Sequence, residues 1–149
     1  MSDEVAGAGI VGACLALKSS RKLIRIQEYF GGLYLVARDA LLPYWFETTR
    51  LDAFARRACG LREPVWFYWI DAYNTMHTVL ADGVLIGFSR DLAELLDHAA
   101  RLALEAERKK DGQGRPELGV KHLMMALARH PNWKFTRGLV RSGFSLERL

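Results

Sequence analysis

The feature that most constrains this fold is a long amphipathic helix, predicted to begin after Ser89 and to end near Asp111-Gly112. Ser89 is a good N-cap, and carboxylates at Asp91 and Glu94 in the first turn complement the helix dipole. Apolar residues recur at helical spacing and form one continuous stripe, made of Leu92, Leu95, Leu96, Ala99, Leu102, Ala103 and Ala106. Such a stripe must pack against other elements, since isolated helices are marginal in water.

The opposite face of this helix pairs opposite charges four residues apart. Asp97 precedes Arg101, and Glu105 precedes Lys109, in the orientation that stabilises a helix. The pairs indicate that this face is exposed to solvent.

A second helix is predicted from about Leu118 to Arg129, after a loop at 113–116. Pro131 ends it, because proline disrupts the helical hydrogen-bond pattern. Its apolar face consists of Val120, Leu123, Met124 and Leu127.

A third, short helix is predicted over about 132–142. Gly143 follows it as a left-handed C-cap, with Phe144 as the hydrophobic contact beyond the cap. Ser145 then caps a fourth helix that the chain scarcely begins.

The first half of the chain is also predicted to be helical, with a less regular pattern. Mixed helical patterning covers 19–42 and 47–59, which Pro43 separates. Pro64 suits the first position of a further helix that ends at Asp82-Gly83. One face of that helix would carry Val65, Trp69, Tyr73, Met76 and Leu80.

Residues 65–86 have an alternative interpretation. In it, 65–70 form a buried strand, and 78–80 pair with 84–86 as a hairpin across AlaAspGly. The helical interpretation is preferred.

Length and composition predict one globular all-α domain spanning 1–149. Half of the 149 residues are hydrophobic and 26% are charged, which argues against a disordered chain and against a multi-span membrane protein. The apolar run 5–17 has 13 residues, short of the roughly 20 that a membrane-spanning helix needs. Asp3 and Glu4 precede this run where a signal peptide would carry positive charge.

Neither a metal site nor a catalytic site is predicted. Cys14 and Cys59 are the only cysteines and fall in no CxxC or Cys/His spacing, so a reducing cytoplasm is the expected location. The sequence contains no GxSxG motif, the nucleophile elbow that would indicate a hydrolase. No metal-ligand spacing such as HExxH occurs among the four histidines, His77, His98, His122 and His130. We therefore expect no metal, no cofactor and no catalytic residue.

Positive charge is concentrated in the second half. Residues 1–87 carry nine basic and nine acidic side chains, whereas residues 88–149 carry twelve and eight. Such an excess can attract an acidic peptide, nucleic acid or anionic lipid, although most charged helical faces are simply solvated. The predicted basic face comprises Arg129, Lys134, Arg137 and Arg141.

Four aromatic residues follow one another from Trp66 to Trp69. A helix would point them in nearly every direction, so some must be exposed or covered by a partner. Aromatic side chains are enriched at interface hot spots, so Trp66 and Trp69 are candidate contacts for self-association or docking. Burial in the core is the alternative.

Three segments of the second half together resemble the Clp N-terminal domain family. Segments 88–100 and 118–129 look like the two signature helices of a Clp repeat, and 139–149 is similar to its closing segment. The resemblance covers 62 of the 149 residues. It implies a helical bundle in which 88–149 form one four-helix repeat and 1–87 form a diverged repeat or a helical cap.

The resemblance implies binding without chemistry. In this family the N-terminal domain docks substrates and adaptors, while ATP is hydrolysed elsewhere in the unfoldase, and this chain has no GxxxxGK[ST] motif. We therefore expect a protein-interaction module, acting as an adaptor, decoy or accessory subunit. Its expected partner is a protein or peptide, such as a Clp-type unfoldase or its substrates, with nucleic acid as a less favoured partner.

The resemblance also implies binding residues. Phe88 matches the Phe that opens the repeat and borders a docking groove, and Asp97 stands where an acidic residue can line that groove. His122 belongs to the family's GluHisLeuLeu motif, where the imidazole serves packing and local hydrogen bonding. The alternatives are that Phe88 belongs to the core and that Asp97 serves only its pair with Arg101.

Lys121 is the largest departure from the family pattern, because it replaces the Glu of that motif. In some members this Glu helps to hold the guanidinium of phosphorylated arginine, which a cation would repel by about 1 to 4 kcal/mol. An acidic partner is therefore more plausible, unless Lys121 is only solvated.

GlyAlaGlyIleValGly at 7–12 fits the dinucleotide fingerprint GxGxxG, and Glu28 follows at about the distance of the ribose-binding acid. The fingerprint needs a buried strand before it, which MetSerAspGluValAla does not supply. We predict instead a small-residue helix that packs closely, and a dinucleotide-binding enzyme is the weaker alternative.

Overall fold

The computed structural model describes Gly9, Ala13, 23–61, 87–109 and 118–148. The predictions for Trp66 and Trp69, for the helix from Pro64 with its strand alternative, and for the loop at 113–116 lie outside the described residues.

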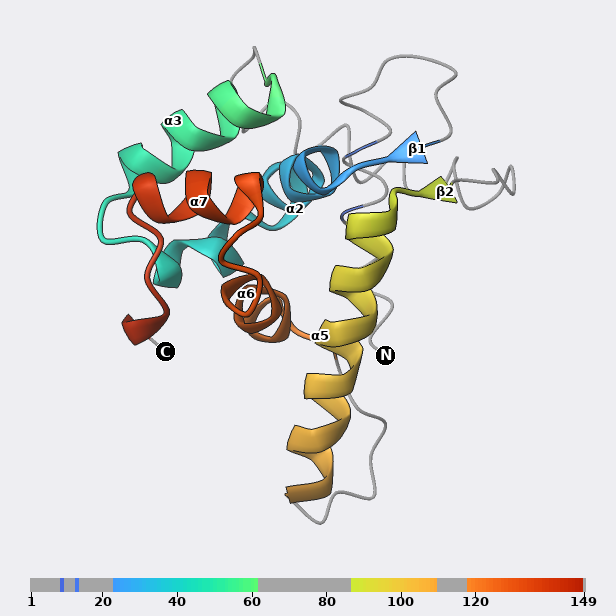
Figure 1. The fold of residues 1–149 in the computed structure, drawn as a ribbon. Helices are drawn as coiled ribbons and strands as arrows, with labels where there is room; N and C mark the ends of the chain where they lie inside the picture. Colours follow the sequence, from blue (N-terminus) through green and yellow to red (C-terminus); the bar gives the residue numbers. More distant parts are fainter. Residues whose placement is uncertain (1–8, 10–12, 14–22, 62–86, 110–117, 149) are drawn as a thin grey trace.

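The described residues form a mainly helical bundle, which confirms the predicted helical class. Figure 1 shows α3 and α7 side by side, and α5 along one side of the bundle, where it packs against α6 and α2. The elements in chain order are β1 (Leu23–Ile24), α2 (Ile26–Leu41), η1 (Leu42–Tyr44), α3 (Thr48–Cys59), β2 (Gly87–Phe88), α5 (Arg90–Lys109), α6 (Val120–Ala128), α7 (Lys134–Arg141) and η2 (Leu146–Arg148).

A short parallel pairing of β1 with β2 was not predicted. Leu23 pairs with Gly87 and Ile24 with Phe88. Strand β1 therefore occupies a segment with predicted helical patterning, and β2 lies just before the helix start predicted at Ser89. The backbone N–H of Ser89 continues the pairing by donating to the Ile24 carbonyl at 2.8 Å. Two-residue strands carry no alternating pattern, so only the tertiary approach of the two segments creates them.

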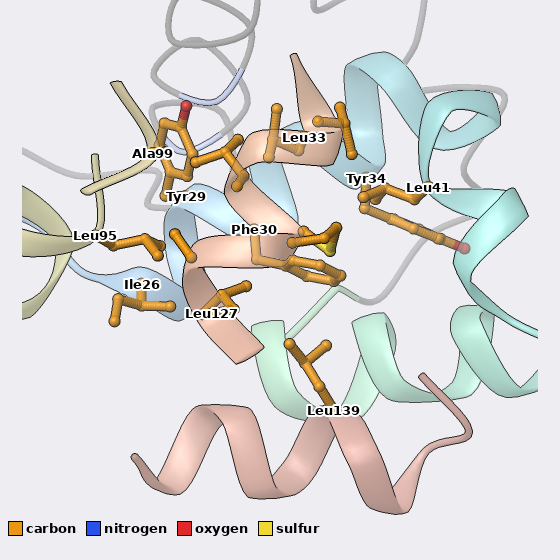
Figure 2. Close-up of a cluster of buried hydrophobic side chains, with 14 of the residues drawn as sticks. Ile26, Tyr29, Phe30, Leu33, Tyr34, Leu41, Leu95, Ala99, Leu127 and Leu139 are labelled. Atoms are coloured by element: carbon orange, nitrogen blue, oxygen red, sulfur yellow. The ribbon is translucent and has the colours of Figure 1, made fainter. Parts of the chain in front are cut away.

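Helix α2 lies at the centre of one hydrophobic core. Figure 2 shows its side chains facing those of the other helices, including Leu95 of α5, Leu127 of α6 and Leu139 of α7. The buried positions of α2 include Ile26, Tyr29, Phe30, Leu33, Tyr34 and Leu35. Both halves of the chain therefore contribute to the same core.

The helix predicted after Ser89 is confirmed as α5. The Leu92 N–H donates to the Ser89 hydroxyl at 3.3 Å, and the Ala93 N–H donates to the Ser89 carbonyl at 2.9 Å. Asp97 and Arg101 form the predicted ion pair at 2.9 Å, with both side chains well exposed. The apolar stripe is buried at Leu92, Leu95, Leu96, Ala99, Leu102 and Ala103.

The C-terminal helices end as the sequence predicts. Gly143 has a φ of 99°, in the left-handed region. Its N–H donates to the Val140 carbonyl, and the Phe144 N–H donates to the Leu139 carbonyl, both at 3.1 Å, which is the Schellman pattern. Phe144 is buried against Trp45 with ring centroids 5.4 Å apart. The last element is a 3-10 helix.

Gly9 and Ala13 support the predicted packing role for the small residues at 7–12. Both are helical and buried. A Cβ at Gly9 would overlap the Tyr29 ring, and a Cβ at Gly32 would overlap the Gly9 carbonyl. Close helix packing therefore occupies the space at Gly9 that a pyrophosphate would need.

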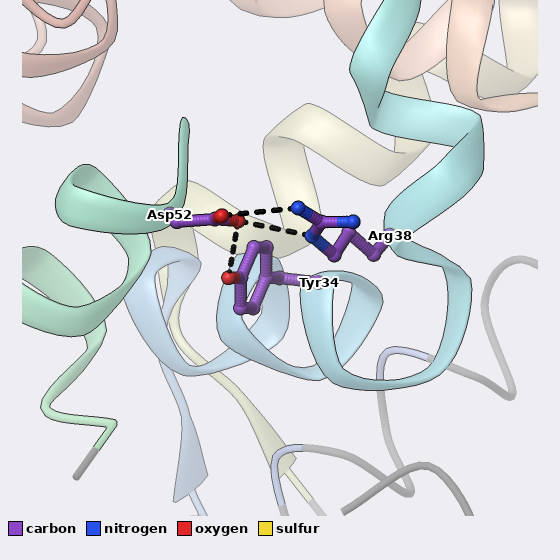
Figure 3. A network of polar contacts seen from close by, with 3 residues as sticks. All are labelled: Tyr34, Arg38 and Asp52. Atoms are coloured by element: carbon purple, nitrogen blue, oxygen red, sulfur yellow. Dashed lines mark hydrogen bonds and ion pairs between the residues drawn. The ribbon is translucent and has the colours of Figure 1, made fainter. Parts of the chain in front are cut away.

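A polar cluster joins α2 to α3. Asp52 of α3 accepts hydrogen bonds from the Tyr34 hydroxyl at 2.6 Å and from Arg38 Nε and Nη2 at 2.9 and 3.0 Å (Figure 3). Burial by itself raises the pKa of Asp52, but the hydrogen bonds from Arg38 and Tyr34 and the nearby positive charge outweigh it, so the pKa lies below its ordinary value. We call these three residues the Asp52 cluster.

Candidate binding pocket

The main candidate site is a pocket of about 920 Å³ between α7, α3 and the first residues of α2 and α5. We call it the cationic pocket and define it by Arg25, Arg57, Lys134, Arg141, Trp133 and Phe135. Its volume lies in the range of sites that bind small ligands or peptide side chains.

Four cations line this pocket. Arg25 precedes α2, Arg57 lies in the last turn of α3, and Lys134 and Arg141 stand at the two ends of α7. All four are exposed, and within the described part of the chain none of them has an ion-pair partner. Asp91 is the one carboxylate among the lining residues that the structure describes. The pocket therefore carries a local excess of positive charge.

Aromatic side chains form the apolar part of the pocket. Phe135 packs on Phe30 and Phe54 with ring centroids 5.4 and 5.7 Å apart, and it remains half-buried. Gly138 lets α7 approach α3, because a Cβ there would lie 3.3 Å from Cε2 of Phe54. The pocket therefore combines a cationic rim with an apolar surface.

A second pocket of about 780 Å³ lies on the other side of α7. Pro131, Val140, Phe144 and Leu146 supply its apolar lining, and Arg137 and Arg141 border it. Arg141 thus lines both pockets.

The predicted basic face is exposed at all four positions, Arg129, Lys134, Arg137 and Arg141. Lys134 and Arg141 join the cationic pocket, and Arg137 lines the second pocket. Arg129 follows the end of α6 and lines neither.

The residues implied by the Clp resemblance are not brought together in either pocket. Phe88 lies in β2 and is 36% exposed, so it does not belong to the core. Asp97 is engaged by Arg101, and Lys121 is exposed on the first turn of α6. His122 accepts a hydrogen bond from the Gly119 N–H at 3.0 Å and helps to cap α6, as predicted.

A pair of histidines lies beside the cationic pocket. Nδ1 of His98 and Nε2 of His130 are 3.3 Å apart, and the His130 ring stacks on Trp133 with centroids 3.9 Å apart and planes 11° apart. Burial and the positive neighbours His130, Arg129 and Arg101 lower the pKa of His98. The sequence contains no signal for this pair, because its members are 32 residues apart.

Sequence reasoning missed Arg25 and Arg57. Both lie in the half of the chain that the Clp resemblance does not cover, and the packing of α3 against both α2 and α7 brings them near Lys134 and Arg141. Their one visible signal was positive charge next to helix ends.

Among the described residues, no group of three or more His, Cys, Asp or Glu side chains is placed to hold a metal ion. Burial, followed by the charge of Glu28, raises the pKa of the Cys59 thiol to about 12, so the thiol stays protonated at neutral pH.

No helix in the described part of the chain is long and apolar enough to cross a membrane. No family model, no curated protein and no solved structure matches this chain.

Proposed function

We propose that this protein is a protein-interaction module whose docking site is the cationic pocket. The observation that carries the proposal is the set of four exposed cations, without ion-pair partners in the described residues, around a partly apolar pocket. Most exposed charges without a partner are simply solvated, but charges that surround an apolar pocket can provide specificity and fast association.

The Clp resemblance is part of this proposal. We suggest an adaptor, decoy or accessory subunit related to the substrate-docking domain of Clp-type unfoldases, acting by binding and without catalysis. What supports the relationship is the likeness of segments 88–100, 118–129 and 139–149 to a Clp repeat, together with their positions at the start of α5, over α6 and across the end of α7. The relationship sets the choice of partner to test first.

Affinity capture with matched variants tests the proposal. Wild-type protein, Lys134→Glu and Arg108→Glu are used as baits, first with a purified Clp-type unfoldase and then with a cell extract. The last two baits carry the same change of charge, but only Lys134 lines the pocket, whereas Arg108 is exposed near the end of α5. We expect a partner that is retained by wild type and Arg108→Glu and lost with Lys134→Glu. Equal recovery by all three baits would exclude the cationic pocket as the docking site.

A second candidate function is binding of nucleic acid or an anionic surface. The exposure of Arg129, Lys134, Arg137 and Arg141 favours it. The affinity for a single-stranded oligonucleotide should then fall steeply with salt, in proportion to the phosphates that are neutralised. Binding that is absent at low salt, or that is insensitive to salt, would argue against this function.

A further inference from the structure

We infer that the cationic pocket binds an acidic peptide segment that carries one apolar side chain between its carboxylates. The inference rests on the proposed docking function and adds the chemical class of its ligand. It follows from the charge of the pocket rim, from the half-buried aromatic lining and from the ring contacts of Trp133 and Phe135.

The charge of the rim requires an anionic ligand. Arg25, Arg57, Lys134 and Arg141 line the pocket from three helices, against Asp91 as the single carboxylate among the described lining residues. An exposed ion pair changes an affinity by about two- to fivefold, so several pairs formed together give a strong preference for acidic over neutral ligands. A lone anion would use these charges but leave the apolar lining uncovered.

The apolar lining requires a side chain. Trp133 and Phe135 are only half-buried, and Phe54 lies beneath them in the core. Gly138 adds no side chain to this part of the lining, and a Cβ there would lie 3.3 Å from Cε2 of Phe54. Burial of one large apolar side chain here would strengthen binding by about tenfold or more.

The ring packing favours a peptide over a nucleic acid. Stacked bases need open aromatic faces. One face of Trp133 is already covered by His130, and Phe135 packs on both Phe30 and Phe54. An inserted aliphatic or aromatic side chain can pack on whatever part of each half-buried ring remains exposed.

Fluorescence anisotropy with a defined peptide tests the inference. The probe is a fluorescein-labelled, amidated peptide of sequence Glu-Asp-Phe-Glu-Asp. One control peptide, Gln-Asn-Phe-Gln-Asn, removes the charge, and another, Glu-Asp-Ser-Glu-Asp, removes the apolar side chain. We expect each control to bind about tenfold more weakly or worse.

Protein variants locate the binding. Lys134→Glu places a carboxylate at the first residue of α7, where the helix dipole stabilises a negative charge. We therefore expect the variant to keep its fold while the charge at position 134 is reversed. We expect it to weaken binding of the probe by about fivefold or more. Arg108→Glu carries the same charge change outside the pocket and should stay within about twofold of wild type.

Three results would overturn the inference: equal affinity for the acidic and neutral peptides, equal effects of Lys134→Glu and Arg108→Glu, or displacement of the probe by a ten-residue oligothymidylate that binds more tightly. The capture experiment distinguishes this failure from failure of the proposed function. A protein partner that is lost with Lys134→Glu would leave the docking function standing with a different ligand chemistry.

Discussion

The Asp52 cluster and the cationic pocket share helix α3 but use charge in opposite ways. Asp52 receives three hydrogen bonds, and the Arg38 and Asp52 side chains are only 30% and 28% exposed. The four pocket cations are exposed and have no ion-pair partner among the described residues. The first set of charges stabilises the joint between α2 and α3, whereas the second remains available to a ligand.

The largest expected effect is on the Asp52 cluster. Asp52→Ala should lower the free energy of unfolding by about 1–3 kcal/mol, because it leaves Arg38 and Tyr34 without their acceptor. Urea denaturation measures the change. Asp39→Ala removes an exposed carboxylate of α2 and should stay within about 0.5 kcal/mol. Equal losses in the two variants would mean that the cluster contributes nothing specific.

The pH dependence of the same cluster gives the next effect. The pKa of Asp52 lies below its ordinary value of 3.8, so its stabilisation is fully present above about pH 4 and is lost as the pH falls through the lowered pKa. The difference in unfolding free energy between wild type and Asp52→Asn should therefore be constant from pH 7 to about pH 5. It should shrink on further acidification. A gap that widens in acid would contradict this sign.

A smaller effect separates stability from binding at the cationic pocket. Lys134→Glu should raise the free energy of unfolding by about 0.3–1 kcal/mol, because it places a carboxylate in the first turn of α7. Arg141→Glu, in the last turn, should lower it by a similar amount. Both variants should weaken binding of the acidic peptide. Binding that followed stability, rising in one variant and falling in the other, would argue against the pocket.

The smallest expected effect concerns His98. This side chain contacts His130, as a residue of the Asp52 cluster contacts its partners, but it also lies near the cations Arg129 and Arg101. Its folded pKa is lower than the ordinary value of 6.5, so the unfolded chain takes up the proton first as the pH falls. Stability should therefore decrease below about pH 6.5 and be less pH-dependent in His98→Gln. Denaturation between pH 7.5 and about pH 5.5 measures the slope. An unchanged slope in His98→Gln would assign the effect to other groups.

Elements with strong local signals were predicted well. Ser89, the stripe from Leu92 to Ala103, and the Gly143-Phe144 stop depend on interactions between residues close in sequence, and each appears as expected. The closely packing glycine at position 9 was also anticipated as a structural feature. The Clp resemblance and the binding roles of Phe88, Asp97 and Lys121 stay predictions.

Features that depend on distant residues were not predicted. The pairing of Ile24 with Phe88 has too few residues to produce a pattern. Arg25 and Arg57 carried no motif, although the basic face that they complete was predicted at Lys134 and Arg141. A sequence gives the charge of a side chain, but its neighbours across the fold decide whether that charge is paired.

The sequence by itself determined that the chain forms short amphipathic helices with a basic C-terminal region, because helix caps, breakers and apolar spacing act over a few residues. Only the tertiary structure decided which charged side chains are paired and which are exposed without an ion-pair partner among the described residues. Packing of α2 on α3 brings Arg38 to Asp52, and packing of α3 against both α2 and α7 gathers four cations around aromatic side chains without giving them an ion-pair partner in the described residues. The same physical interaction therefore stabilises the fold in one place and, in the function that we propose, would hold a ligand in the other.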